Sequence, residues 1–90
     1  LDPVLHNQLR LAVMSFLVAV DSADFNYLLE KTGATRGNLS VQISKLKEAG
    51  YIEVTKSFKD NYPNTACRVS QHGLAAFEVY VAAIKSYLKN

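Results

Sequence analysis

The sequence predicts a mainly α-helical domain with one small β-hairpin, in the order helix, helix, helix, hairpin, helix. Apolar residues recur at steps of three and four within residues 5–20 and again within residues 74–88, which is typical of helices that bury one face. Residues 51–58 instead contain an apolar and polar alternation and are rich in β-branched and aromatic types, which favours a strand.

The chain length sets the domain organisation. Ninety residues with 49% hydrophobic and 20% charged side chains are typical of one folded domain, residues 1–90, with a single small core. The longest apolar-rich stretch, Leu11 to Val20, is about half of the ~20 residues that cross a bilayer. We therefore expect a soluble, cytoplasmic protein without a membrane partner. The single cysteine, Cys67, fits a reducing compartment.

The first two helices have recognisable ends. Asp2 is a suitable N-cap and Pro3 a suitable first residue, so the first helix is expected from there to Val20, where the residues DSAD interrupt it. A short second helix is expected over residues 25–31, because Gly33 can adopt the left-handed backbone that ends a helix.

The third helix is expected over residues 36–49, with Thr35 as its N-cap. Only three or four residues separate it from the second helix, as in a helix-turn-helix. Its narrow apolar seam is formed by Leu39, Ile43 and Leu46.

A hairpin follows the helix-turn-helix. The strand over 51–58 leads into the turn-forming residues KDNYPN, and TACRV at 65–69 can return as its antiparallel partner. Ser70 can then cap a last helix over residues 71–89. A hairpin directly behind a helix-turn-helix makes the winged helix-turn-helix fold, with residues 51–69 as the wing.

Two stretches resemble a known family. The line NLSVQISKLKEAGYIEV, followed by a polar hairpin tip and then RVSQHGLAAFEVYVAAI, is similar to the compact winged-helix DNA-binding domains related to the MarR and ArsR transcriptional regulators. Ser70 and Gly73 also match the family's capping pattern. The resemblance covers almost the whole chain.

This resemblance implies a homodimer that binds duplex DNA and regulates transcription. It implies further that the third helix lies in the major groove, while the hairpin reaches the sugar-phosphate backbone or the minor groove. Relatives carry more arginine at the hairpin tip, where this sequence has Asn61, Tyr62, Pro63 and Asn64.

Helical spacing identifies the face of the third helix that a groove can accept. With ~100° per residue, small and polar residues lie opposite the apolar seam. Asn can read adenine, Ser can donate or accept, and Val can contact a thymine methyl group. Lys47 projects nearer the core side, and Glu48 is expected in solvent. The predicted DNA contacts of this helix are Thr35, Arg36, Gly37, Asn38, Ser40, Val41, Ser44 and Lys45.

Positive charge is concentrated in the middle of the chain. Residues 31–72 carry seven Lys and Arg against three Asp and Glu, whereas residues 1–30 carry one Arg against four acidic side chains. A polyanion favours such a segment, although an ordinary solvated surface explains the count equally well. The predicted DNA contacts of the wing are Lys56, Lys59, Asn61, Asn64 and Arg68.

The last helix has more apolar surface than one core can bury. Its apolar positions span about 180°, against the ≳100° of a helix packed on one side. One part can pack on the domain and another on the same helix of a second copy through a two-fold contact. The alternative is a monomer with exposed tyrosines. The predicted dimer contacts are Leu74, Phe77, Tyr80, Val81, Ala83, Ile84, Tyr87 and Leu88.

The sequence shows no motif of a metal site, a cofactor site or an enzyme. His6 and His72 have no neighbours at metal-ligand spacing, so we expect no metal and no cofactor. No nucleophile with a base and no phosphate loop is visible, so an enzyme is not expected. Cys67 fits a buried position better than a redox sensor. Two alternatives stay open: the polar helix face could dock another protein instead of DNA, and a cleft between subunits could hold a small-molecule effector.

Overall fold

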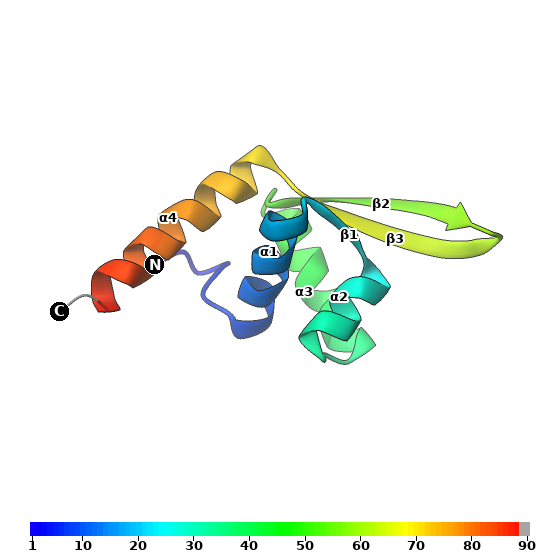
Figure 1. Ribbon diagram of the computed structural model, residues 1–90, viewed down its shortest axis with the longest axis horizontal. Coiled ribbons are helices and arrows are strands. Elements are labelled where there is room, and N and C mark those ends of the chain that lie inside the picture. The colour runs from blue at the N-terminus through cyan, green and yellow to red at the C-terminus, as the bar shows by residue number, and fades with distance from the viewer. Residues whose placement is uncertain (89–90) are drawn as a thin grey trace.

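The computed structural model describes residues 1–88. Four helices and a small β-sheet confirm the predicted winged-helix fold class, and Lys89, the expected end of the last helix, lies outside the described residues. Figure 1 shows α1, α2 and α3 clustered together, with the β2–β3 hairpin extending to one side and α4 to the other. The elements are α1 (Gln8–Val20), β1 (Ser22–Asp24), α2 (Phe25–Thr32), α3 (Arg36–Glu48), β2 (Ile52–Lys59), β3 (Tyr62–Val69) and α4 (Gln71–Leu88).

The core lies where α1 meets α2, α3 and the base of the sheet. Each fully buried aliphatic side chain contributes roughly 1.5–3 kcal/mol relative to an exposed one, so burial of this cluster stabilises the fold. The fully buried residues are Leu5, Val13, Met14, Leu17, Leu28, Leu39, Leu46 and Cys67.

The predicted start of the first helix at Pro3 is wrong. The Asp2 carboxylate accepts hydrogen bonds from the N–H groups of Val4 and Leu5, but it caps only a turn. The helix begins at Gln8, because Asn7 is extended and its side chain accepts the N–H of Arg10. The turn buries Leu5 completely against the core.

The residues DSAD do more than interrupt a helix. Ser22–Asp24 form strand β1, which the sequence analysis missed, and β1 pairs antiparallel with β3 through Ser22 and Arg68. The sheet is therefore three-stranded, in the order β1-β3-β2, and the hairpin is its larger part. Three residues are too few to show an alternating pattern, so only the long-range pairing reveals this strand.

The helix-turn-helix agrees with the prediction. Gly33 ends α2 in the left-handed conformation, with φ at 68°. Thr35 then caps α3, and its hydroxyl accepts the N–H of Asn38. Leu39, Ile43 and Leu46 are the buried residues of α3, as predicted.

The hairpin is more regular than the sequence predicts. Asp60 and Asn61 both have positive φ and form a two-residue turn, which matches the natural twist of the paired strands. Tyr62, Pro63 and Asn64 were expected in the turn but lie in β3. The difference arises because Asp and Asn tolerate left-handed backbone and make the tight turn by themselves.

Helix α4 is fixed to the domain at its first turn. The Ser70 hydroxyl accepts the N–H of Gly73 and donates to the carbonyl of Gly50, which confirms Ser70 as the cap. Within residues 1–88, no helix is long and apolar enough to cross a membrane. The same residues hold no cluster of three His, Cys, Asp or Glu side chains placed for a metal ion.

Candidate nucleic-acid interface

The outer face of α3 is exposed, and many of its side chains are small. All eight residues predicted as DNA contacts of this helix are exposed. Val41, at the middle of this face, is 50% exposed. At Gly37, apart from its chain neighbours and the backbone of its own helix, no atom of the described residues lies within 4 Å of the position that a Cβ would occupy. The helix can therefore approach another surface closely without moving its own neighbours.

A cationic cavity of about 400 Å³ lies between α3 and the wing. Arg36 and Lys47 of α3 and Lys56 of β2 line it, together with three hydroxyl side chains. Arg36 is held beside the start of α2, where its guanidinium lies 5.8 Å from the centre of the Phe25 ring. The hydroxyl side chains are those of Ser40, Ser44 and Thr65. Such a set of cations and hydroxyls can bind phosphate oxygens.

Lys47 is the residue of this cavity that the sequence analysis placed too near the core. It is exposed and lines the cavity with Lys56. At ~100° per residue it lies only ~20° from Ser40 around the helix, so the spacing alone places Lys47 on the same side as a predicted DNA contact. The position of the wing beside that flank supplied the missing information.

The two faces of the wing carry different residues. Cross-strand partners share a face, and successive residues of a strand alternate between faces. Lys56 lies opposite Thr65, on the face that borders α3. Asn61 is in the turn, whereas the other three predicted wing contacts, Lys59, Asn64 and Arg68, lie on the opposite face.

Arg68 also has a partner within the domain. Its guanidinium lies 3.2 Å from the carboxylate of Asp21, just before β1. Both side chains are more than half exposed, so this ion pair adds little stability. The structure therefore brings Lys56 to the α3 face and places Arg68 beside β1.

The winged helix DNA-binding domain family matches residues 9–88, which include all the elements just described except the start of α1. The chain belongs to this family. An uncharacterized protein of Methanocaldococcus jannaschii is 31% identical over 87 residues, which cover 97% of this chain and 95% of that protein. The resemblance derived from the sequence is thereby confirmed.

Two solved structures are similar in fold. A transcriptional regulator homologue from Pyrococcus horikoshii OT3 superposes with a TM-score of 0.90 at 25% identity, over 97% of this chain and 86% of that one. The antimony-specific transcriptional repressor AntR superposes with a TM-score of 0.69 at 19% identity, over 97% of this chain and 76% of that one. This winged-helix domain is therefore a DNA-binding domain related to transcriptional regulators.

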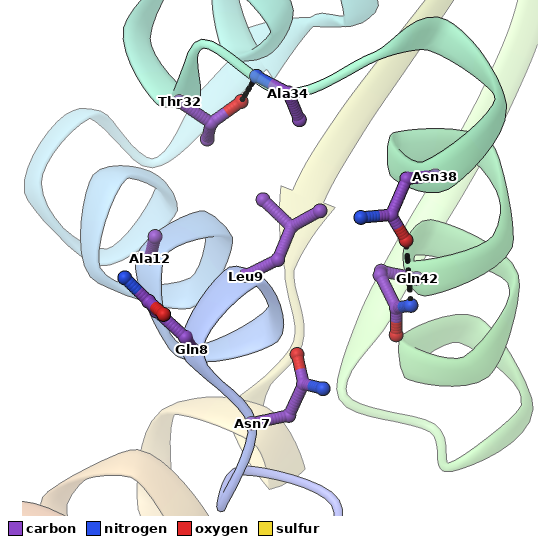
Figure 2. A pocket seen from close by; sticks show the side chains of 8 residues that line it. All are labelled: Asn7, Gln8, Leu9, Ala12, Thr32, Ala34, Asn38 and Gln42. Atoms are coloured by element: carbon purple, nitrogen blue, oxygen red, sulfur yellow. Dashed lines mark hydrogen bonds between the residues drawn. The ribbon is translucent and has the colours of Figure 1, made fainter.

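The other flank of α3 faces α1, and a cavity there is lined by uncharged residues. Asn38 and Gln42 line this cavity of about 440 Å³, with Asn7 and Gln8 across it (Figure 2). The Gln42 amide donates to the Asn38 side-chain oxygen at 3.0 Å, and the Arg10 guanidinium donates to the Gln42 oxygen. Asn38 is thus held by a chain of hydrogen bonds and lies apart from the cationic cavity.

Two further charged residues of α3 lie near its end. Lys45 and Glu48 line a third cavity, together with Arg10 and the N-terminal turn. Glu48 is exposed, as expected. Gln42, by contrast, was not singled out from the sequence, because its link to Arg10 depends on how α1 crosses α3.

In the winged-helix domain, α4 presents apolar side chains to more than one side. Tyr80 is buried, and its hydroxyl lies 3.0 Å from the Nδ1 atom of His6. Phe77 and Ile84 are partly buried against the core. Other apolar side chains of the helix are exposed, and the most exposed of them, between 70% and 80%, are Val79, Tyr87 and Leu88. Val79 was not among the predicted dimer contacts.

Cys67 is a core residue. Burial raises the pKa of its thiol to about 11, and the nearby Asp24 carboxylate adds to the shift. A reactive thiol needs exposure and a lowered pKa, and Cys67 has neither. The prediction that Cys67 acts as a small buried hydrophobe is confirmed.

Proposed function

We propose that this domain acts as a homodimer that binds duplex DNA at specific sequences and regulates transcription. In this proposal α3 lies in the major groove and the β2–β3 hairpin contacts the adjacent backbone. The carrying observation is the cavity between α3 and the wing, where Arg36, Lys47 and Lys56 meet beside the open helix face. The family of the chain and the regulator homologue from Pyrococcus support the same conclusion.

In this proposal the outward face of α3 contacts the edges of the bases. Val41 is positioned for a thymine methyl group, and Ser40 and Ser44 for polar base edges. Gly37 lets the start of α3, with its free N–H groups and favourable dipole, approach a phosphate. Thr35, Asn38 and Lys45 complete the proposed contacts of the helix, on the flank nearer α1.

Backbone phosphates are bound by the cations. Phosphate contacts set affinity and register, while base contacts set sequence preference. Lys56 borders the cavity, so we assign it the strongest wing contact. Lys59, Asn64 and Arg68 lie on the far face of the hairpin and are given weaker roles, as is Asn61 in the turn.

Dimerisation is assigned to α4. Its exposed apolar side chains exceed what one domain can cover, and a two-fold contact between two α4 helices would bury them. The predicted contacts that remain exposed or partly exposed in the single chain are available for this role. Two copies of α3 would then face half-sites about 34 Å apart, on a pseudo-palindromic site. Such a regulator acts where the DNA is, and we therefore propose a cytoplasmic location.

The salt dependence of duplex binding tests the proposal. DNA binding through several phosphates weakens steeply with salt, with a log-log slope of about −0.9 per neutralised phosphate. A steep linear decrease in the affinity for duplex DNA is therefore expected. The absence of duplex binding at low salt would contradict the proposal and favour a winged-helix module that binds another protein.

A further inference from the structure

The tip of the wing carries two exposed aromatic side chains. Phe58 is 79% exposed and Tyr62 is 75% exposed. In the strand register Phe58 lies opposite Pro63, whereas Tyr62 lies opposite Lys59. Neighbouring positions of a strand point to opposite faces, so the two rings occupy opposite faces of the hairpin. Phe58 shares the face of Lys56, which borders α3.

Phe58 therefore extends the surface beside the cationic cavity toward the tip of the wing. Positions two residues apart on a strand are about 7 Å from each other, so Phe58 is the next residue beyond Lys56 on this face. A molecule that covers this face must carry negative charge where it meets the cavity and an apolar surface where it meets Phe58. Duplex DNA has this arrangement, because its phosphates line the groove edges and its stacked bases lie between them.

The hairpin fixes the backbone that carries the Phe58 ring. The strands stay paired up to Lys59 and Tyr62, and the two-residue turn of Asp60 and Asn61 follows directly. Because the backbone is already fixed, burial of the ring costs side-chain entropy but little backbone entropy.

We propose that the wing inserts the Phe58 ring into the minor groove next to the half-site that α3 contacts, between two base steps, and thereby bends the duplex. This inference rests on the proposed function, because it needs α3 in the neighbouring major groove. Apolar wedges of this kind partly unstack a base step and kink DNA by roughly 20–90°. The wedge gives the tip of the wing a DNA contact although the tip has no arginine.

The test uses a duplex that the wild-type protein recovers from a random pool. Dyes at the two ends report the bend by energy transfer, and 2-aminopurine placed in successive base steps reports unstacking by its fluorescence. Phe58→Ala is expected to remove both signals and to weaken binding roughly tenfold, as for the loss of a base–aromatic contact. Phe58→Leu keeps an apolar wedge and is expected to retain most of the bend.

Tyr62→Ala is the matched control. It removes an equally exposed ring from the opposite face, so it is expected to leave the bend unchanged. Neither variant touches the buried core, and both should unfold at the wild-type urea concentration. A wild-type complex without a bend, or the same bend in Phe58→Ala, would overturn the wedge while the proposed function stands. A wild-type protein that binds no duplex at low salt would overturn the proposed function and the wedge together.

Discussion

Gly73 lies where the first turn of α4 crosses the start of β2. A Cβ atom at this position would lie 2.0 Å from the carbonyl oxygen of Tyr51, which belongs to the backbone and cannot rotate away. Gly37 at the start of α3 has the opposite surroundings, because open space surrounds it. The two glycines therefore differ in their surroundings: Gly73 permits a close packing contact, whereas Gly37 leaves the start of α3 open.

Alanine substitutions test this difference. Gly73→Ala is expected to lower the free energy of unfolding by about 1–3 kcal/mol, because α4 must shift to admit the methyl group. Gly37→Ala is expected to raise it by up to about 1 kcal/mol, since alanine favours the helix. Urea unfolding measures both changes. Equal unfolding midpoints for wild type and Gly73→Ala would show that the close approach to Tyr51 does not matter.

The Tyr51 hydroxyl donates a hydrogen bond to the Asp2 carboxylate and thereby links the N-terminal turn to the residue that precedes β2. This bond, together with burial, raises the pKa of Tyr51 to about 12. Burial alone would raise the pKa of Asp2, but the hydrogen bonds from Tyr51, Val4 and Leu5 outweigh it and lower that pKa. Each group is thus stabilised in the form that the folded protein contains at neutral pH.

This pair predicts a pH dependence at both extremes. Because the folded pKa of Tyr51 exceeds its ordinary value of 10.0, its contribution is complete below pH 10 and is lost as the pH rises to about 12. The contribution of Asp2 is present above its ordinary pKa of 3.8 and is lost as the pH falls through its lower folded pKa. The difference in unfolding free energy between wild type and Tyr51→Phe, followed by chemical denaturation, should shrink in the alkaline range. A difference that stays constant from pH 9 to pH 12 would contradict this assignment.

At the scale of elements, local signals explain which parts of the fold the sequence reveals. Helix α3 combines a good cap, a regular seam and a glycine beyond its end, and all three act within a few residues. Strand β1 has no such signal, since it exists only through its pairing with β3. The start of α1 was misplaced because Asp2 and Asn7 are both capping residues, and only the burial of Leu5 selects the second.

The two faces of the β2–β3 hairpin give a prediction for this element. Lys56→Ala should make the slope of log affinity against log salt concentration less steep by about 0.9, because one phosphate contact is lost. Arg68→Ala is the matched control, since it removes a cation from the opposite face and should change the slope less. Affinity measured across a range of salt concentrations distinguishes the two. A larger change for Arg68→Ala would reverse the assignment of the faces.

At the scale of the molecule, the sequence indicates a helix face but does not place it next to the wing. The cationic cavity combines residues from α2, α3, β2 and β3, and their meeting depends on how the base of the hairpin lies beside α3. Lys47 was undervalued for this reason. Similarly, helical spacing assigned Asn38 to the groove, but only the crossing of α1 and α3 joins it to Gln42 and Arg10.

The exposed apolar surface of α4 predicts the oligomeric state of the whole molecule. Replacing Val79 and Tyr87 together by Glu should convert a dimer into a monomer, because the two side chains lie ~80° apart on one side of α4 and charge at a two-fold contact meets its own copy. Both side chains are at least 70% exposed, so the fold of the chain should persist. Lys85→Glu places a carboxylate on the other side of α4 and should leave the dimer intact. Sedimentation measures the outcome, and a wild-type monomer at micromolar concentration would contradict the prediction.

Selection of duplexes from a random DNA pool tests the central claim most directly, because it measures sequence preference and symmetry together. Two α3 helices on a two-fold dimer should recover one pseudo-palindromic site whose half-sites are about one helical turn, ~34 Å, apart. Recovery of that site would support sequence-specific binding by a homodimer. A recovered pool with no shared sequence, or no retained duplex at low salt, would contradict it.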